Sequence, residues 1–521
     1  MRKSGILLHI SSLPSKYGIG KMGKSAYDFI DFLSNAGVKC WQVLPISPTS
    51  FGDSPYQSFS VYAGNPYFID FEQLKSDGIL KKSDYDSIKW DTNSKEIDYK
   101  RIYENTFKVL KIAYKNYRND LSAFYFRFTE DNKYWLDDYA LFMALKFANK
   151  GVAWNEWSAP FALRDEEVIA KAKEDYKKDI DFFKFIQYKF FRQWTNLKQY
   201  ANDKGIEIIG DMPIYTAYDS SDVWCNPELF LLDENKKPID VAGCPPDEYS
   251  LTGQLWGNPL YNWKVHKEGT TADKLTVKIT NKNNANAKPE AYKWWRKRIK
   301  FATKLFDVVR IDHFRGFESF YAIPATDETA ENGEWRIGPG AELFKIIEKK
   351  LGKLNVIAED LGFITPEVDA MLKEVGYPGM KVLQFGFGGD SENTYLPHNF
   401  TTSNTVVYTG THDNPTLKGW VSSLNKKTIK HCFEYLNVEK KKEIPNAVIR
   451  LAWSSCAEYA IAQMQDFLGN DENSRMNTPS TLGINWKYRI SDNDLNDDVL
   501  KQIKYLNKLF NRFYEMPKKG G

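Results

Sequence analysis

The chain has 521 residues, 42% of them hydrophobic and 27% charged, so it is long enough to bury a large core. Its 71 basic and 68 acidic residues leave a net charge of +3, which argues against nucleic acid or an anionic membrane as a partner and favours a neutral or weakly charged ligand. No segment resembles a signal peptide or a membrane span, and five cysteines without CxxC spacing argue against a disulfide framework and a zinc site, so we expect a cytoplasmic protein.

Short apolar runs alternate along the chain with longer helical patterns, which predicts βα units and a parallel sheet. Eight runs are strand candidates, the last with the weakest pattern: residues 6–10, 40–44, 206–211, 308–312, 356–359, 382–387, 406–409 and 448–453. Eight such strands, each followed by a helix, predict an α/β fold of the (β/α)8 type, a TIM barrel.

A helix is expected directly after the first of these strands. Ser25 and Asp28 have the spacing of a capping box at its start, and Gly37 follows its end. Between them the apolar residues recur at i, i+3, i+4 and i+7: Ala26, Phe29, Ile30 and Leu33. One apolar face of this helix is therefore expected to pack on the sheet.

Two intervals between strand candidates are far too long to be ordinary βα loops. Residues 46–204, after the second strand, contain an aromatic-rich helical pattern and are expected to form a largely helical insertion subdomain. Residues 212–300, after the third strand, include the Pro-, Gly- and Trp-rich stretch 244–263, an expected active-site loop. Both leave from the C-terminal ends of strands, so they are expected to wall the active-site face of a single catalytic module, residues 1–521.

Three carboxylates stand at or just after the ends of apolar runs: Asp312, Glu359 and Asp413. Acidic groups at the C-terminal ends of barrel strands are typical of active sites. Arg310 shares a strand face with Asp312 and is expected to keep it ionised, as a nucleophile requires. Glu359 follows a more apolar run, so partial desolvation is expected to raise its pKa and let it act as a general acid. His412 precedes Asp413, and both are expected to hydrogen-bond a sugar.

A single aspartate at a strand end is more often a cap or an ion-pair partner than a catalyst, and a lone histidine is more often structural. Three acidic strand ends in one candidate barrel, flanked by histidine and arginine, instead favour a catalytic role. They predict chemistry on glycosidic bonds, and carboxyl groups about 5 Å apart would give a retaining double displacement. Most aromatic residues are expected in the core, with Tyr56 and Trp256 as exceptions in Gly/Pro-rich loops.

Five linked motifs resemble the signature blocks of the 4-α-glucanotransferases of glycoside hydrolase family 77, also called amylomaltases or disproportionating enzymes. They are 53–57 (DSPYQ), 210–215 (GDMPIY), 310–316 (RIDHFRG), 358–362 (AEDLG) and 411–414 (THDN). The resemblance runs from residue 4 to residue 489, and the segment 245–259 favours this branch of the wider α-amylase clan. Residues 267–291, with the Asn/Lys-rich run 281–288 that looks like a mobile loop, depart from the family pattern.

The resemblance implies a (β/α)8 barrel with large insertions and no separate C-terminal β-domain. It implies action on α-1,4-glucans (maltooligosaccharides, starch or glycogen), with glucose as an acceptor. The sequence has no EF-hand-like loop, HExxH motif or cysteine cluster, so neither a metal ion nor another cofactor is expected. Carried over by motif, the nucleophile is Asp312, the general acid/base Glu359 and the transition-state stabiliser Asp413. The residues implied at the cleavage point are Arg310, His313, His412 and Asp211, and further glucan contacts are Ser54, Tyr56, Trp256 and Asn477.

Two other functions stay open at this stage. A hydrolase of the α-amylase type uses the same carboxylates, so residues alone do not decide between transfer and hydrolysis. A non-catalytic glucan-binding protein is the second alternative, although pure binding has no need of a protonated acid beside an ionised base. Donor and acceptor length, cyclic products and oligomeric state are not predicted.

Overall fold

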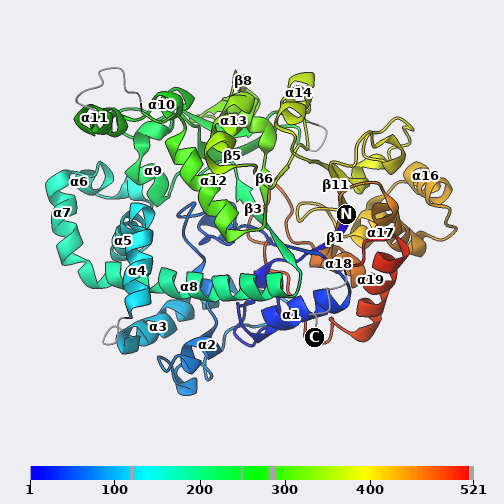
Figure 1. The fold of residues 1–521 in the computed structure, drawn as a ribbon, viewed down its shortest axis with the longest axis horizontal. Coiled ribbons are helices and arrows are strands. Elements are labelled where there is room, and N and C mark those ends of the chain that lie inside the picture. The colour runs from blue at the N-terminus through cyan, green and yellow to red at the C-terminus, as the bar shows by residue number, and fades with distance from the viewer. Residues whose placement is uncertain (1, 118–121, 248–249, 281–288, 515–521) are drawn as a thin grey trace.

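Eight parallel strands form a nearly closed barrel in the computed structural model, which describes residues 2–117, 122–247, 250–280 and 289–514 (Figure 1). In hydrogen-bonded order they are β10 (Gly379–Val382), β11 (Thr405–Tyr408), β12 (Tyr459–Gln463), β1 (Lys3–Leu7), β2 (Cys40–Gln42), β3 (Glu207–Pro213), β6 (Val308–Asp312) and β9 (Val356–Ala358). The N–H of Ala358 donates to the carbonyl of Pro378 at 2.9 Å, so β9 also meets the start of β10. The predicted (β/α)8 barrel is confirmed.

Two of the predicted strands are wrong in whole or in part. Residues 448–453 lie in helix α17 (Ile444–Ser454), whose buried residues repeat with a helical period, and β12 supplies the eighth strand. β12 has the sequence YAIAQ, in which alanines weaken the strand signal. The sixth candidate, 382–387, is displaced: β10 ends at Val382, and the next residues form a 3-10 turn.

The helix after β1 is present, but its predicted start is not. α1 (Lys24–Asn35) begins after Gly23, and no side chain caps it. Asp28 instead pairs with Lys24, with 2.5 Å between Oδ2 and Nζ. The capping-box prediction is therefore wrong, although the apolar face that it preceded is buried as expected.

The long interval between β2 and β3 is mainly helical. Its α-helices are α2 (Phe71–Ser76), α3 (Tyr99–Tyr117), α4 (Ala123–Asp131), α5 (Lys133–Ala148), α6 (Ala159–Ala162), α7 (Glu166–Asp175) and α8 (Lys177–Asp203). Figure 1 shows α3 to α7 gathered at one end of the molecule, with α8 leading back to the barrel. The division into a subdomain at 46–204 stays a prediction.

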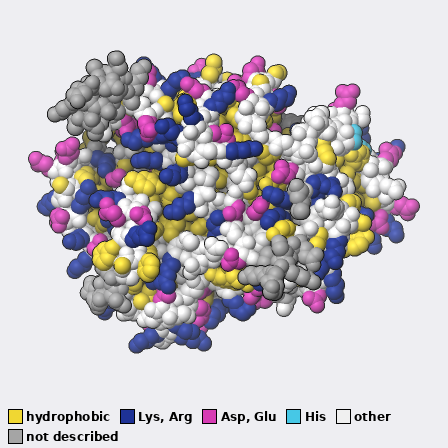
Figure 2. Space-filling view, viewed as in Figure 1, with side chains coloured by type: hydrophobic (Ala, Val, Ile, Leu, Met, Phe, Trp, Pro, Cys, Tyr) yellow, Lys and Arg dark blue, Asp and Glu magenta, His cyan; other side chains and the backbone are white. Residues whose placement is uncertain are grey.

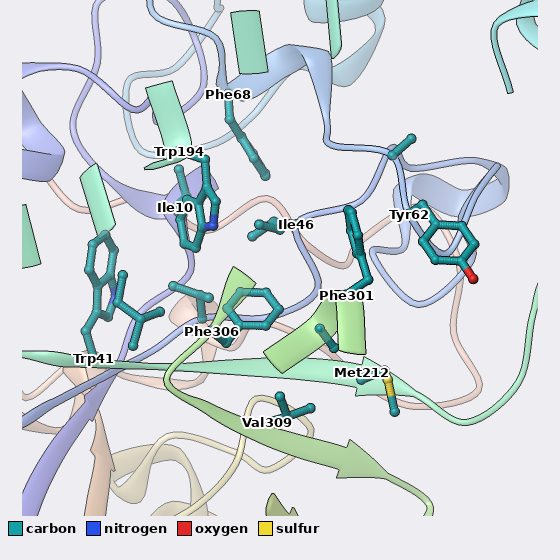
Figure 3. Close-up of a cluster of buried hydrophobic side chains, with 14 of the residues drawn as sticks. Ile10, Trp41, Ile46, Tyr62, Phe68, Trp194, Met212, Phe301, Phe306 and Val309 are labelled. Atoms are coloured by element: carbon teal, nitrogen blue, oxygen red, sulfur yellow. The ribbon is translucent and has the colours of Figure 1, made fainter. Parts of the chain in front are cut away.

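The start of this interval and α8 pack on the outside of the barrel. Figure 3 shows Ile46, Phe68 and Trp194 gathered near Phe301 and Phe306, which lie in or directly after the helix preceding β6. The rings of Trp194 and Phe306 meet edge to face with centroids 5.8 Å apart. This apolar contact fixes the inserted residues against the barrel wall and so positions the loop that reaches the site.

A second, antiparallel sheet was not predicted. Its order is β5 (Gln254–Pro259), β4 (Asp240–Cys244), β7 (Ser319–Pro324) and β8 (Glu334–Ile337). The stretch 244–263, expected to be a loop, is therefore partly a β-hairpin arm, because β5 pairs with β4. The α-helices around it are α9 (Ser221–Cys225), α10 (Trp263–Glu268), α11 (Thr271–Thr280) and α12 (Lys293–Leu305). The expected mobile loop, 281–288, lies outside the described residues.

The other α-helices surround the second half of the barrel: α13 (Gly340–Leu351), α14 (Pro366–Val375), α15 (Leu417–Ser423), α16 (Lys426–Leu436), α18 (Met464–Phe467) and α19 (Asp497–Leu509). After β12, the described residues up to 514 contain helices and no further strand. Within the described ranges, no helix is both long and apolar enough to cross a membrane. Figure 2 shows basic and acidic side chains interspersed over one face, as the balanced charge predicts.

Candidate active site

Arg310 joins two carboxylates inside the barrel. Its Nη1 atom donates to both oxygens of Asp211, at 2.8 and 2.7 Å, and to Oδ1 of Asp312 at 2.9 Å. The strand register explains the first contact, since Arg310 of β6 lies opposite Asp211 of β3. The hydroxyl of Tyr56 also donates to Asp211, at 2.9 Å. Arg310 and Asp211 are buried, whereas the side chain of Asp312 is 27% exposed and can be reached by a ligand.

Burial and the charge of Arg310 have opposite effects on the pKa of Asp312. Burial raises the pKa of Asp312 well above its usual range, and Arg310 lowers it without reversing the shift. Arg310 also pairs with Asp211, and Glu359 adds a further negative charge, so the expectation that Asp312 is the ionised acid stays a prediction. Acidic groups that interact this strongly titrate together, so any proton belongs to the pair.

Glu359 directly follows β9 and is held by two backbone N–H groups. Its Oε2 accepts from His313 at 2.6 Å, and its Oε1 accepts from Leu361 at 2.8 Å. Burial raises the pKa of Glu359 to about 6, although both N–H donors favour the ionised form. The raised pKa agrees with the expectation of partial desolvation, and the role of general acid stays a prediction.

Asp312 and Glu359 lie at equivalent positions at the C-terminal ends of two neighbouring strands. β6 and β9 are neighbours, with Ile311 opposite Ala358, so the next residue on each strand is one of the two acids. Neighbouring strands lie about 4.8 Å apart, and residues in register on parallel strands point to the same face. The two carboxyl groups therefore start from adjacent positions at the C-terminal end of the barrel.

Asp413 is anchored by three neighbours in the loop after β11 and in the segment before residue 478. Its Oδ2 lies 3.2 Å from Nε2 of His412, and its Oδ1 accepts from the side-chain amide of Asn477 at 2.6 Å. Arg475 donates to the backbone carbonyls of Asp413 and Asn477, at 2.5 and 2.7 Å. The structure thus brings His412 and Asn477, both predicted site residues, to Asp413. Arg475 was missed, although it lies two residues before Asn477.

An aromatic wall stands between Asp413 and Asp211. The ring of Tyr56 stacks on His412 with centroids 5.1 Å apart and an interplanar angle of 11°, and Trp486 lies 5.8 Å from Tyr56. Ser54 supports this wall, because its hydroxyl accepts the N–H of Tyr56 at 3.2 Å. Burial lowers the pKa of His412, so its ring is a neutral hydrogen-bonding group. Trp486 was not predicted; its place in a Gly- and Asn-containing loop was the available signal.

Trp256 lies between His313 and the loop that carries Tyr56, where Gln57 donates to its carbonyl at 3.4 Å. Its ring meets His313 edge to face at 4.8 Å, and burial lowers the pKa of His313 to about 3. The side chains of Gln57 and Asn258 are hydrogen-bonded at 3.0 Å and link the loop that carries Tyr56 to β5. Sequence patterns did not single out this link.

In the described part of the chain, no three His, Cys, Asp or Glu side chains are grouped so as to hold a metal ion. The five cysteines are free thiols, and two of them, Cys40 and Cys432, are buried. The groups that converge at the end of the barrel are therefore carboxylates, neutral histidines and aromatic rings, which suit a neutral polyhydroxylated ligand.

Comparison with known proteins agrees with this geometry. A family model described as 4-alpha-glucanotransferase matches residues 8–271 and 280–495. The interruption lies within 267–291, where a departure from the family pattern was expected. A 4-alpha-glucanotransferase of Clostridium butyricum is 48% identical over 507 residues, covering 97% of this chain and 100% of the relative. One from Streptococcus pneumoniae is 44% identical over 519 residues, covering 99% and 98%.

A solved structure extends the likeness to three dimensions. The amylomaltase from Streptococcus agalactiae in complex with acarbose superposes with a TM-score of 0.92 at 41% identity, covering 98% of this chain and 100% of the other. The sequence motifs, the family match and the fold agree over nearly the whole length. The chain belongs to the 4-alpha-glucanotransferase family.

Proposed function

We propose that the protein is a 4-α-glucanotransferase that moves a segment of an α-1,4-glucan to the 4-hydroxyl of another glucan or of glucose by a retaining double displacement. The observation that carries the proposal is the placement of Asp312 and Glu359 in register at the ends of neighbouring strands. Strand spacing of about 4.8 Å suits the separation of about 5 to 5.5 Å in retaining enzymes, whereas inverting enzymes need about 6.5 Å or more.

Asp312 is the proposed nucleophile. Of the two acids, it has the direct ion pair, at 2.9 Å from Nη1 of Arg310, whereas Glu359 is held by uncharged N–H groups. A full positive charge favours an ionised neighbour more than a peptide dipole does, so the proton of the pair is assigned to Glu359. The ionised oxygen of Asp312 then attacks the anomeric carbon, and a covalent glycosyl-enzyme forms.

Glu359 is the proposed general acid and then the general base. As the C–O bond breaks, the leaving oxygen takes the proton of Glu359, and the shortened glucan departs. In the second half-reaction the Glu359 carboxylate takes the proton of the incoming 4-hydroxyl, whose oxygen displaces Asp312 from the anomeric carbon. Glu359 thus gives a proton in the first half-reaction and takes one in the second, so the enzyme returns to its starting protonation state after each transfer.

The remaining residues are assigned to the donor sugar. Asp413, fixed by His412 and Asn477, is positioned to hold hydroxyl groups of the ring that distorts in the transition state. Tyr56, stacked on His412, offers an aromatic surface beside it. Arg310, Asp211, His313 and Ser54 complete the proposed donor set, whereas Trp256 is assigned to the acceptor. The insertions after β2 and β3 are proposed to wall this site within a single catalytic module, and a cytoplasmic location completes the proposal.

The experiment that tests the function is incubation with maltotriose followed by chromatography. Longer oligosaccharides together with glucose support transfer. Maltose and glucose alone would identify a hydrolase of the α-amylase type. An unchanged substrate that still binds, measured by calorimetry, would identify a non-catalytic glucan-binding protein.

A further inference from the structure

An exposed apolar patch lies beside the loop that carries Glu359. Phe363 is 60% exposed, and Trp335 and Ile337 on the edge strand β8 are 39% and 86% exposed. We call these three residues the Trp335 platform. Aromatic and aliphatic surface of this kind is unfavourable in water unless a ligand covers it, so the platform needs an explanation.

The platform is built on a buried arginine. The guanidinium of Arg315, a residue that is 3% exposed, lies 3.8 Å from the ring centroid of Trp335. Its Nη1 donates to the carbonyl of Phe363, and its Nη2 donates to the hydroxyl of Ser319 at 2.9 Å. Ser319 lies opposite Ile337 in the sheet register. The Arg315 side chain therefore supports both the ring of Trp335 and the main chain of Phe363, and Ile337 lies two residues after Trp335, on the same face of β8.

The platform lies on the leaving-group side of the proposed reaction. Glu359 protonates the leaving oxygen, so its carboxyl faces the direction in which the first product departs and the acceptor sugar arrives. Phe363 follows Glu359 by four residues, and the intervening Leu361 holds Glu359 through its N–H at 2.8 Å. Asp413, His412 and Asn477, which hold the donor sugar, cluster elsewhere, around the loop after β11.

We infer that the Trp335 platform binds the acceptor glucan beyond the sugar that reacts, and that it sets the preference for acceptor length. This inference rests on the proposed transferase function. The guanidinium of Arg315 is buried, each of its Nη atoms donates a hydrogen bond, and its Nε is buried without a partner, so the exposed atoms of the platform belong to the apolar side chains above it. α-Glucans present C–H faces of their rings to such surfaces, whereas a charged ligand gains nothing there. The platform is continuous with the Glu359 loop, which makes a glucan chain the matching occupant.

The test compares acceptors of different length. Phe363→Ala removes an exposed ring but keeps the main-chain carbonyl that Arg315 binds, so the fold is expected to persist. With α-glucosyl fluoride as donor, the acceptor KM of maltotetraose is expected to rise about fivefold, and that of glucose by less than about twofold. Trp335→Phe keeps an aromatic face and is expected to give a smaller rise than Trp335→Ala. Phe124→Ala, at a 77% exposed position on α4, is the matched control.

Equal acceptor KM values in Phe363→Ala, Trp335→Ala and the wild type would overturn the inference and would favour a protein partner as the occupant of the patch. A uniform rise for glucose and maltotetraose would also overturn it, because it would indicate a general disturbance of the Glu359 loop. Failure of the proposed function looks different: the wild type itself would then transfer nothing to any acceptor.

Discussion

Replacing Glu359 by glutamine separates the two proposed carboxyl roles. The variant keeps the shape of the side chain but has no proton to give to the leaving oxygen. Both oxygens of Glu359 accept backbone N–H groups, whereas an amide has one oxygen, so the N–H of His313 or Leu361 must face an NH2 group. That lost hydrogen bond costs about 1 kcal/mol, or about fivefold, whereas a general acid contributes about 10²- to 10⁴-fold. The loss of the proton therefore dominates the expected fall in transfer from maltotriose.

The assay uses a donor whose leaving group needs no proton. With α-glucosyl fluoride, Glu359→Gln is expected to form the glycosyl-enzyme but to resolve it slowly, because the base for the second half-reaction is also missing. Mass spectrometry of the digested protein is expected to find the adduct on Asp312. Glu434→Gln, at a 67% exposed position on α16, is the matched control and is expected to behave as the wild type.

The pH profile gives a second readout of the same residue. Burial raises the pKa of Glu359 to about 6, and the acid form is the active one in the first half-reaction. Turnover of maltotriose is therefore expected to fall as the pH rises above this pKa, and the fall is expected to vanish in Glu359→Gln. The reasoning is refuted if the first, single-turnover release of fluoride is lost as completely as maltotriose turnover, or if the adduct lies on a residue other than Asp312.

Three further predictions concern single residues. Asp312→Asn removes the attacking charge, so turnover is expected to fall by a factor on the order of 10³ or more with folding intact by circular dichroism. Trp256→Ala is expected to lower transfer more than hydrolysis, seen as a higher proportion of free reducing ends; equal losses would contradict a role in holding the acceptor. Asp466 accepts from Leu417 N–H and the Thr409 hydroxyl, both at 2.7 Å, and burial raises its pKa to about 7. The folded state thus holds this proton more tightly, and stability is expected to fall between about pH 4 and about pH 7, less so in Asp466→Asn, by thermal unfolding.

The barrel and its acids were predictable because both depend on local pattern. Valine and isoleucine runs that end in a carboxylate identify buried parallel strands and their functional ends, as β6 and β9 show. β12 was not predicted because its alanines have little strand preference. Residues 448–453 were predicted as a strand because they contain valine and isoleucine, although they lie in a helix. Local composition decides such predictions, and here tertiary packing overrode it.

The second sheet and the contacts between loops could not be predicted from local pattern. β7 pairs with β4, which lies far earlier in the chain, and short antiparallel strands in a Gly- and Pro-containing region have no distinct period. Arg475, Trp486 and the Gln57–Asn258 link depend on side chains that meet only after folding. Their residue types are common in ordinary loops, so single residues gave no sign of the contact.

The Gln57–Asn258 link suggests how the two insertions cooperate. Gln57 follows Tyr56, which binds Asp211, and Asn258 is fixed to the carbonyl of Thr216 at 3.0 Å close to Trp256. Breaking the 3.0 Å bond by Gln57→Ala is expected to loosen Trp256 relative to the donor site and to raise the acceptor KM by about fivefold, the effect of about 1 kcal/mol. Asn258→Ala also removes the bond to the Thr216 carbonyl, so if Gln57 and Asn258 act as one link, the double variant raises the acceptor KM by less than the product of the two single effects. Additive losses in this double-mutant cycle would show that the two side chains act separately and that the insertions are positioned by other contacts.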